Sequence, residues 1–152
     1  MRVSSHGITM EAPAGFDIEI YSRPDIEGRI LPDNPAILHA ANFWLPRERS
    51  DFGHEIVETM RLVDVFLALV EYGPRAAKKA LFAPSGIPEI DPDSLSPDVI
   101  MGAPSGQAGV QRFFHVGARA FSLYAVVGSF RLRSRTMPLV GEMLRTLQVL
   151  SI

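Results

Sequence analysis

The chain has 152 residues, no cysteine and a formal net charge of −2, from 15 basic and 17 acidic residues. A chain of this length is the size of one domain and can bury roughly 70% of the surface that its unfolded form exposes. The lack of cysteine excludes disulfides, thiolate nucleophiles and cysteine-ligated metal sites. The near balance of charge provides no broad positive field for a phosphate backbone, so we expect no nucleic-acid partner.

The N-terminal segment predicts neither a leader nor a membrane anchor. Its first 15 residues hold one arginine and no apolar core of signal-peptide length. The longest uninterrupted apolar run, residues 65–70, is far shorter than a membrane span. We therefore expect a soluble, cytoplasmic protein without a membrane partner.

The first third of the chain predicts strands joined by loops. Residues 7–12 and 16–21 flank Pro13-Ala14-Gly15, a turn pattern, and together predict a half-solvated hairpin. Residues 22–35 contain three prolines without periodicity and predict a connecting loop. A strand is expected at residues 36–44, closed by Pro46.

The middle of the chain predicts one short helix, one buried strand and one long excursion. Within residues 50–60, Ser50 or Asp51 can cap a short helix. Residues 63–72 are mostly apolar at both odd and even positions, which is typical of a central strand buried on both faces. A short helical stretch follows Gly73-Pro74 up to about residue 81. Residues 83–109 are rich in proline and lack periodicity, so we expect a long arm with one helical turn near residues 94–100.

The last third of the chain carries the most informative pattern. Residues 110–116 and 119–127 predict a hairpin whose loop, Gly117-Ala118, suits a type II′ turn because glycine leads it. That turn sets the cross-strand neighbours and makes one face of the hairpin largely apolar. The expected pairs are Val116 with Arg119, Phe114 with Phe121, Arg112 with Leu123 and Val110 with Ala125.

A helix is expected at about residues 137–147, because apolar residues recur there at helical spacing and form a stripe that can cover the hairpin. The stripe consists of Met137, Val140, Met143, Leu144 and Leu147. The order of the elements indicates an α+β fold: one domain over residues 1–152, with a central antiparallel sheet packed against helices and a Pro-rich excursion at about residues 83–109.

Three segments carry a family resemblance. They are EAPAGF at residues 11–16, GARAFSLY at residues 117–124, and the last helix running into LQVL at residues 147–150. Over nearly its whole length the chain resembles the MOG1/PsbP-like fold, an α/β sandwich. The resemblance implies a non-enzymatic accessory or binding protein, because members mostly serve small GTPases or photosystem complexes. No residue of this chain matches the partner-binding positions of those members.

Four further segments are similar to uncharacterised proteins of high-GC actinobacteria. They are LHAA at residues 38–41, DFG at 51–53, ALVEY at 68–72 and GQAGVQRFF at 106–114. This actinobacterial similarity implies no activity.

No motif in the chain predicts a metal, a cofactor or a catalytic residue. His54 and Glu58 lie one helical turn apart, but a further ligand at metal-site spacing is missing, so ordinary surface polarity explains them better. Ser85 and Ser105 lie in Pro-Ser-Gly turns and outside the nucleophile pattern G-x-S-x-G. The glycine-rich residues 102–109 lack the lysine of a P-loop and precede a strand, so a hinge is expected there.

Arg131, Arg133 and Arg135 form the best candidate site for an anion or a partner. They alternate with other residues just before the last helix, so on an extended segment their guanidinium groups would project to one side. The unpaired N–H groups of a helix N-terminus also favour anions. A solvated basic turn is the competing interpretation, because arginines are mostly exposed.

These patterns favour a non-enzymatic accessory or binding protein that acts through protein or small-ligand contacts, with an unidentified protein partner. Trp44, the single tryptophan, is expected to be half-covered at the end of its strand. Two alternatives stay open. One is a small hydrolase or isomerase in which a histidine such as His39 or His115 works with a carboxylate. The other is a homodimer whose arm at residues 83–109 crosses to the second copy.

Overall fold

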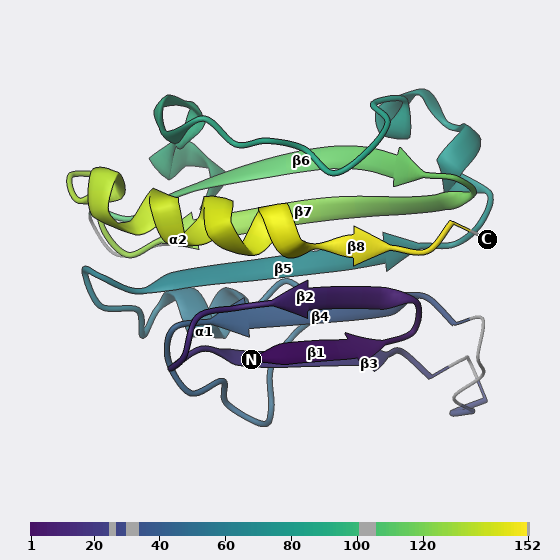
Figure 1. The fold of residues 1–152 in the computed structure, drawn as a ribbon, viewed down its shortest axis with the longest axis horizontal. Coiled ribbons are helices and arrows are strands. Elements are labelled where there is room, and N and C mark those ends of the chain that lie inside the picture. Colours follow the sequence, from purple (N-terminus) through teal and green to yellow (C-terminus); the bar gives the residue numbers. More distant parts are fainter. Residues whose placement is uncertain (25–26, 30–33, 101–105, 152) are drawn as a thin grey trace.

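Two antiparallel sheets and one substantial helix make up the computed structural model, which describes residues 1–24, 27–29, 34–100 and 106–151. The larger sheet has five strands (Figure 1). Their spatial order is β3 (Asp17–Ser22), β4 (Ala36–Ala41), β5 (Val65–Tyr72), β7 (Arg119–Val127) and β6 (Ala108–Val116). The fold is therefore α+β and mostly β, with the antiparallel sheet that the sequence predicts.

The second sheet and the helix cover one face of the large sheet. The second sheet has the order β1 (Arg2–Ser5), β2 (Ile8–Glu11) and β8 (Gln148–Val149). Figure 1 shows this sheet and α2 (Arg133–Thr146) side by side in front of the large sheet. The main hydrophobic core fills the space between these layers, with β5 and β7 beneath α2.

The C-terminal hairpin is confirmed in detail. All four expected cross-strand pairs are present, from Val116 opposite Arg119 to Val110 opposite Ala125. Gly117 has a φ of 58° while Ala118 has no positive φ, which is the combination that a type II′ turn requires. β6 begins at Ala108, two residues before the expected start.

The helix α2 starts at Arg133, one turn before the expected residue 137, and ends at Thr146. The expected stripe is buried against the sheet, and Thr136 extends it by one residue. The prediction began too late because it used the apolar residues alone, and the polar first turn of the helix has none. Pro138 is tolerated inside the helix on an exposed position.

β5 is the third of five strands, so the prediction that residues 63–72 form a central strand is confirmed apart from two residues at its start. β4 ends at Ala41, three residues before the expected end.

The expected hairpin of residues 7–12 and 16–21 is wrong. β2 and β3 belong to different sheets, so the turn at residues 13–15 carries the chain from one layer to the other. β2 pairs instead with β1. His6 and Gly7 join them with φ values of 55° and 72°, which fit a two-residue hairpin loop.

Loops and short helical turns cover the second face of the large sheet and the edge at β6, where the sequence predicts helices, and the arm packs Leu95 into the core on the side of α2. α1 (His54–Val57) begins after Gly53; the hydroxyl of Ser50 accepts from the amide of Gly53 at 3.2 Å, but no side chain of the cap residue itself bonds the first turn. The stretch after Gly73 forms two 3-10 turns, Ala76–Lys78 and Ala80–Phe82, and two more lie in the arm, Pro92–Ser94 and Pro97–Val99.

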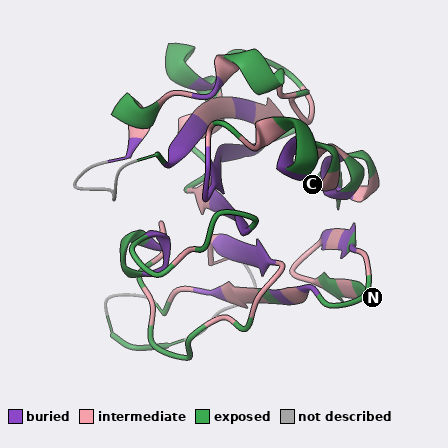
Figure 2. Cartoon of the chain, turned by 90° about the vertical axis from the view of Figure 1, so that its left-hand side faces the viewer, coloured by how far each residue is buried: buried purple, intermediate pink, exposed green. Residues whose placement is uncertain are grey.

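The arm bonds to the edge of its own β6. Ser96 pairs with Gly109, and Ser85 forms a bridge with His115. In Figure 2 the arm and the outer loops are mostly exposed, while the strands behind them are mostly buried. Among the helices of the described residues, none is long and apolar enough to cross a membrane.

Candidate functional site

His39 is buried at the centre of a polar cluster on the second face of the large sheet. β4 places its side chain opposite Glu19 of β3, under the loop of residues 45–51. Its Nδ1 accepts a hydrogen bond of 2.7 Å from Nε of Arg49. Because arginine can only donate, Nδ1 carries no proton, and the Nε2–H group donates to the carbonyl of Asp51 at 2.7 Å. His39 is therefore neutral and fixed in one tautomer.

Arg49 ties the covering loop to this cluster. Its Nη2 lies 2.9 Å from Oε2 of Glu19, and its Nη1 donates to the carbonyl of Pro46 at 2.6 Å. The side chain of Arg49 is only 3% exposed. Nη2 meets Glu19 as an ion pair without hydrogen-bond geometry, whereas Nε and Nη1 both donate, and these contacts hold residues 46–49 in place.

Asp51 closes the cluster from the other side. Its Oδ1 accepts from the hydroxyl of Tyr21 at 3.1 Å, and its Oδ2 lies 3.2 Å from Nε of Arg23. Burial raises the pKa of Tyr21, and the charge of Asp51 adds to the effect. Burial also lowers the pKa of His39 below its ordinary value of 6.5. Both shifts keep the two rings neutral at neutral pH.

The alternative of a catalytic histidine finds no free base in this cluster, because both ring nitrogens of His39 are engaged. His115 lies beside the backbone of Ser85, and its Nδ1–H donates to the carbonyl of Phe82 at 2.7 Å, which leaves Nε2 as the basic nitrogen; among the described residues no carboxylate bonds this ring. In the part of the chain that the structure describes, no group of three histidine or carboxylate side chains could hold a metal ion. Ser105 lies outside the described residues, as does the first half of the glycine-rich stretch at residues 102–109, residues 102–105.

The three arginines before the last helix do not lie on an extended segment. Arg133 and Arg135 belong to the first turn of α2, and neighbours two apart on a helix point to different sides. Arg133 stacks on the ring of Phe130 at 4.0 Å and lies 3.6 Å from Asp93 of the arm. Arg131 and Arg135 are exposed. Binding of an anion or a partner by these residues stays a prediction. The expected arrangement, with all three guanidinium groups on one side of an extended segment, is absent.

Trp44 is 89% exposed, so the expectation that it is half-covered is wrong. It stands on the loop that follows β4, beside a hollow of about 310 Å³. The hollow is lined by Gly15, Phe16, Asp17, Asn42, Phe43, Trp44 and Arg61. Asn42 fixes the neighbouring loop, because its side chain donates to the carbonyl of Val63 and accepts from the amide of Val65.

Two exposed aliphatic residues follow Arg61 on that neighbouring loop. Leu62 is 63% exposed and Val63 is 44% exposed. We call Trp44, Leu62, Val63 and the hollow the Trp44 surface. Large apolar side chains that remain open to solvent at neighbouring loops are typical of a contact site.

A larger hollow, of about 680 Å³, lies at the opposite end of β5. Its polar wall contains Glu71 and Arg119, which form a two-bonded ion pair at 2.8 and 2.9 Å. Arg119 also donates to the carbonyls of His6 and Leu150, and Glu71 accepts from the amide of Ala36. These groups satisfy one another and join the chain ends to the large sheet, which is a structural role.

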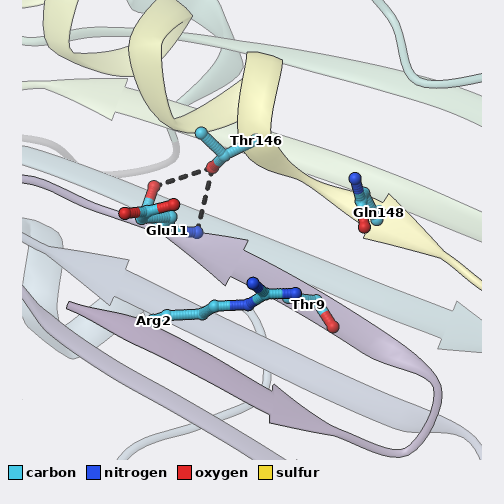
Figure 3. Close-up of a pocket in the computed structure, with 5 residues that line it drawn as sticks. All are labelled: Arg2, Thr9, Glu11, Thr146 and Gln148. Carbon is cyan, nitrogen blue, oxygen red and sulfur yellow. Dashed lines mark hydrogen bonds between the residues drawn. The ribbon is translucent and has the colours of Figure 1, made fainter.

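A small polar hollow of about 180 Å³ lies on the outer side of the small sheet (Figure 3). Figure 3 shows the hydroxyl of Thr146 at the backbone of Glu11, where it meets the amide at 3.0 Å and the carbonyl at 2.7 Å. The contact fastens the end of α2 to β2. Arg2, Thr9 and Gln148 complete this open wall.

Comparisons with known proteins identify no relative: no family model, no curated protein and no solved structure matches this chain.

Sequence reasoning missed Trp44 as a surface residue and Arg49 as a buried one. The pattern Phe43-Trp44-Leu45-Pro46 predicts the end of a strand, although proline soon after an aromatic residue also fits a loop. The run Arg47-Glu48-Arg49 looks like solvated charge, and nothing in it shows that one of the two arginines turns inward.

Proposed function

We propose that this chain is a non-enzymatic binding protein that contacts a protein partner through the Trp44 surface. The observation that carries the proposal is the 89% exposure of the single tryptophan beside an aromatic-lined hollow. Tryptophan buries more apolar area than other side chains when a partner covers it, and it is enriched among residues that dominate binding energy.

The size of the hollow favours a protein over a larger free ligand. At about 310 Å³ it is at the lower limit of small-molecule pockets, and it accepts one protruding apolar side chain of a partner. Leu62 and Val63 are exposed on the loop just after Arg61, which lines the hollow, and we include them in the proposed interface. A finer assignment of the fold as a MOG1/PsbP-like sandwich belongs to the same proposal. It is supported by the layer of α2 and the small sheet on one face of an antiparallel sheet.

Site-specific photo-cross-linking tests the proposal. A benzophenone amino acid is placed at Leu62, and its cross-linked product in the native host is compared with that from Leu81, which is 57% exposed elsewhere on the molecule. We expect a discrete product from position 62 that Trp44→Ala abolishes and that position 81 does not give. Equal products from both positions, or a product that survives Trp44→Ala, would contradict the proposal.

The cross-linked partner is then purified and titrated against the chain. Trp44→Ala should weaken binding by about 30-fold, because a central tryptophan contributes about 2 kcal/mol or more to an interface. The matched control is Leu81→Ala, for which we expect less than about a threefold change. A Trp44→Ala variant that binds as well as the control refutes the proposed surface.

The homodimer alternative also remains a proposal. In the structure the arm bonds to β6 of its own chain at Gly109 and His115, and an exchanged arm would form the same bonds with a second copy. Size-exclusion chromatography of the full chain and of a variant without residues 83–109 distinguishes a crossed arm from one that stays on its own chain.

A further inference from the structure

The loop that carries Trp44 is fastened to the large sheet by a few polar contacts. The amide of Leu45 donates to Oδ2 of Asp17 at 2.9 Å, next to Trp44 itself. Beyond it, residues 46–51 are held by the contacts of Arg49 and Asp51 with His39, Glu19 and Tyr21. His39 is the centre of this fastening, because it bonds both ends of the stretch from Arg49 to Asp51.

The bond between Arg49 and His39 exists only while Nδ1 is unprotonated. A protonated imidazole has no acceptor, and its Nδ1–H would face the Nε–H of Arg49 at the present 2.7 Å. Two donors and two positive charges cannot share that distance in a buried site.

The charges around His39 balance only when the imidazole is neutral. Glu19 and Tyr21 face it from β3, and Arg49 and Asp51 face it from the covering loop. β5 contributes the ring of Phe66 and Ala68, which carry no charge. Arg23 joins the cluster through Asp51. Two carboxylates therefore meet two guanidinium groups, and a proton on His39 adds an uncompensated positive charge.

We propose that His39 is an acid-sensitive latch for the loop that carries Trp44. When Nδ1 takes a proton from solvent, Arg49 leaves for solvent, the imidazolium takes its place against Glu19, and residues 46–49 are released, while Nε2–H keeps its bond to the carbonyl of Asp51. The charge balance is restored, because one cation replaces another beside the same two carboxylates. Burial favours the neutral imidazole, so the latch stays closed at neutral pH and opens as the pH falls below the ordinary histidine value of 6.5.

Release of the latch should weaken binding at the Trp44 surface, because a loosened loop no longer presents Trp44 in a fixed position. This consequence rests on the function proposed above, whereas the release itself does not.

Amide hydrogen exchange on the full chain measures the release. Between about pH 7.5 and about pH 5, we expect exchange in the peptide covering residues 45–53 to become at least about tenfold faster, after correction for the intrinsic rate with an unstructured peptide. Nitrogen-detected NMR of His39 should show an Nε2–H tautomer at the higher pH and a doubly protonated ring at the lower pH.

Two variants at the latch make the experiment specific. His39→Asn keeps a non-titrating acceptor toward Arg49, so exchange should stay slow at both pH values. Arg49→Met removes the donor, so exchange should be fast at both. His115→Asn is the matched control on another strand and should keep the acid transition. Should His39→Asn fail to fold, Glu19→Gln serves instead, and its transition should move to lower pH because the carboxylate that attracts the imidazolium is gone.

The outcomes separate the two proposals. An unchanged exchange rate across this range, or an acid transition that persists in His39→Asn, overturns the latch whatever the partner does. Absence of a cross-linked product at position 62 overturns the proposed function and leaves the exchange result to decide the latch. Binding that weakens in acid in the wild type but not in His39→Asn supports both.

Discussion

The ion pair of Glu71 and Arg119 should contribute more to folding than any other charged pair described here. Both side chains are nearly buried, at 12% and 8% exposure, and two short hydrogen bonds join them. Arg119 also donates to the carbonyls of His6 and Leu150, near the two chain ends. Arg119→Met keeps the length of the side chain and removes every one of these donors.

The expected loss of unfolding free energy for Arg119→Met is about 3–5 kcal/mol, because the carboxylate of Glu71 is left buried without its counter-charge. Loss of the hydrogen bonds to the carbonyls of His6 and Leu150 adds little to this free energy, because both residues lie close enough to the surface for water to replace the guanidinium. Glu71→Leu with Arg119→Met should cost less than the sum of the two single changes, because the double variant leaves no unpaired charge.

Urea unfolding followed by far-ultraviolet circular dichroism measures these losses. Fluorescence is a poor probe, because Trp44 is already exposed in the folded chain. The matched control is Arg133→Met, whose side chain is 31% exposed and lies 3.6 Å from Asp93, and which should cost less than about 1 kcal/mol. A loss below about 1 kcal/mol for Arg119→Met, or strict additivity in the double variant, would refute the reasoning.

Three further predictions concern pH and backbone geometry. Burial lowers the pKa of His39 in the folded chain below that in the unfolded chain. The neutral imidazole therefore stabilises the fold fully above about pH 6.5, and this stability is lost as the pH falls through the pKa of the folded chain. Urea unfolding midpoints measured at several pH values should decline in acid less steeply for His39→Asn than for His115→Asn. Burial raises the pKa of both Tyr21 and Tyr124 above the ordinary 10.0, so a spectrophotometric titration should show these two phenols ionising late, and normal ionisation of both would contradict the buried placement. Gly53→Ala should lower the free energy of unfolding by about 1–2 kcal/mol because of the φ of 70°, and by about 1–3 kcal/mol more because the new Cβ would lie 2.5 Å from Cζ of Phe66. Gly86 has a φ of 88° and open space around it, so Gly86→Ala should show only the first loss in urea unfolding.

The parts of the fold that the sequence predicts correctly are those set by local periodicity and turn chemistry. The register of the C-terminal hairpin follows from the two-residue turn that begins at Gly117, because that turn fixes which residue of β7 lies opposite each residue of β6. The central position of β5 follows from its apolar residues at both odd and even positions, which point to both faces of the sheet. Both features are properties of neighbouring residues, so no knowledge of the distant chain is needed.

The main error arises where two neighbouring strands can pair with the same strand. β2 has a turn pattern on each side, and local rules cannot decide whether it pairs with β1 or β3. The His6-Gly7 loop decides in favour of β1, because both residues adopt positive φ and form a tight hairpin. The turn at residues 13–15 is then free to cross between the layers.

The cluster around His39 shows why a candidate site is harder to predict than a sheet. Its members come from β3, β4 and a covering loop without periodicity, and each alone looks like an ordinary surface charge or a core residue. One clue is present in the sequence: Asp17 and Glu19 alternate with Ile18 on a strand, so their face cannot be apolar. Because Arg49 is buried beside His39, its guanidinium needs a counter-charge, and Glu19, which lies opposite His39 and is 54% exposed, supplies it. The position of that carboxylate can be derived from the strands, whereas the choice of Arg49 over Arg47 depends on the path of the loop.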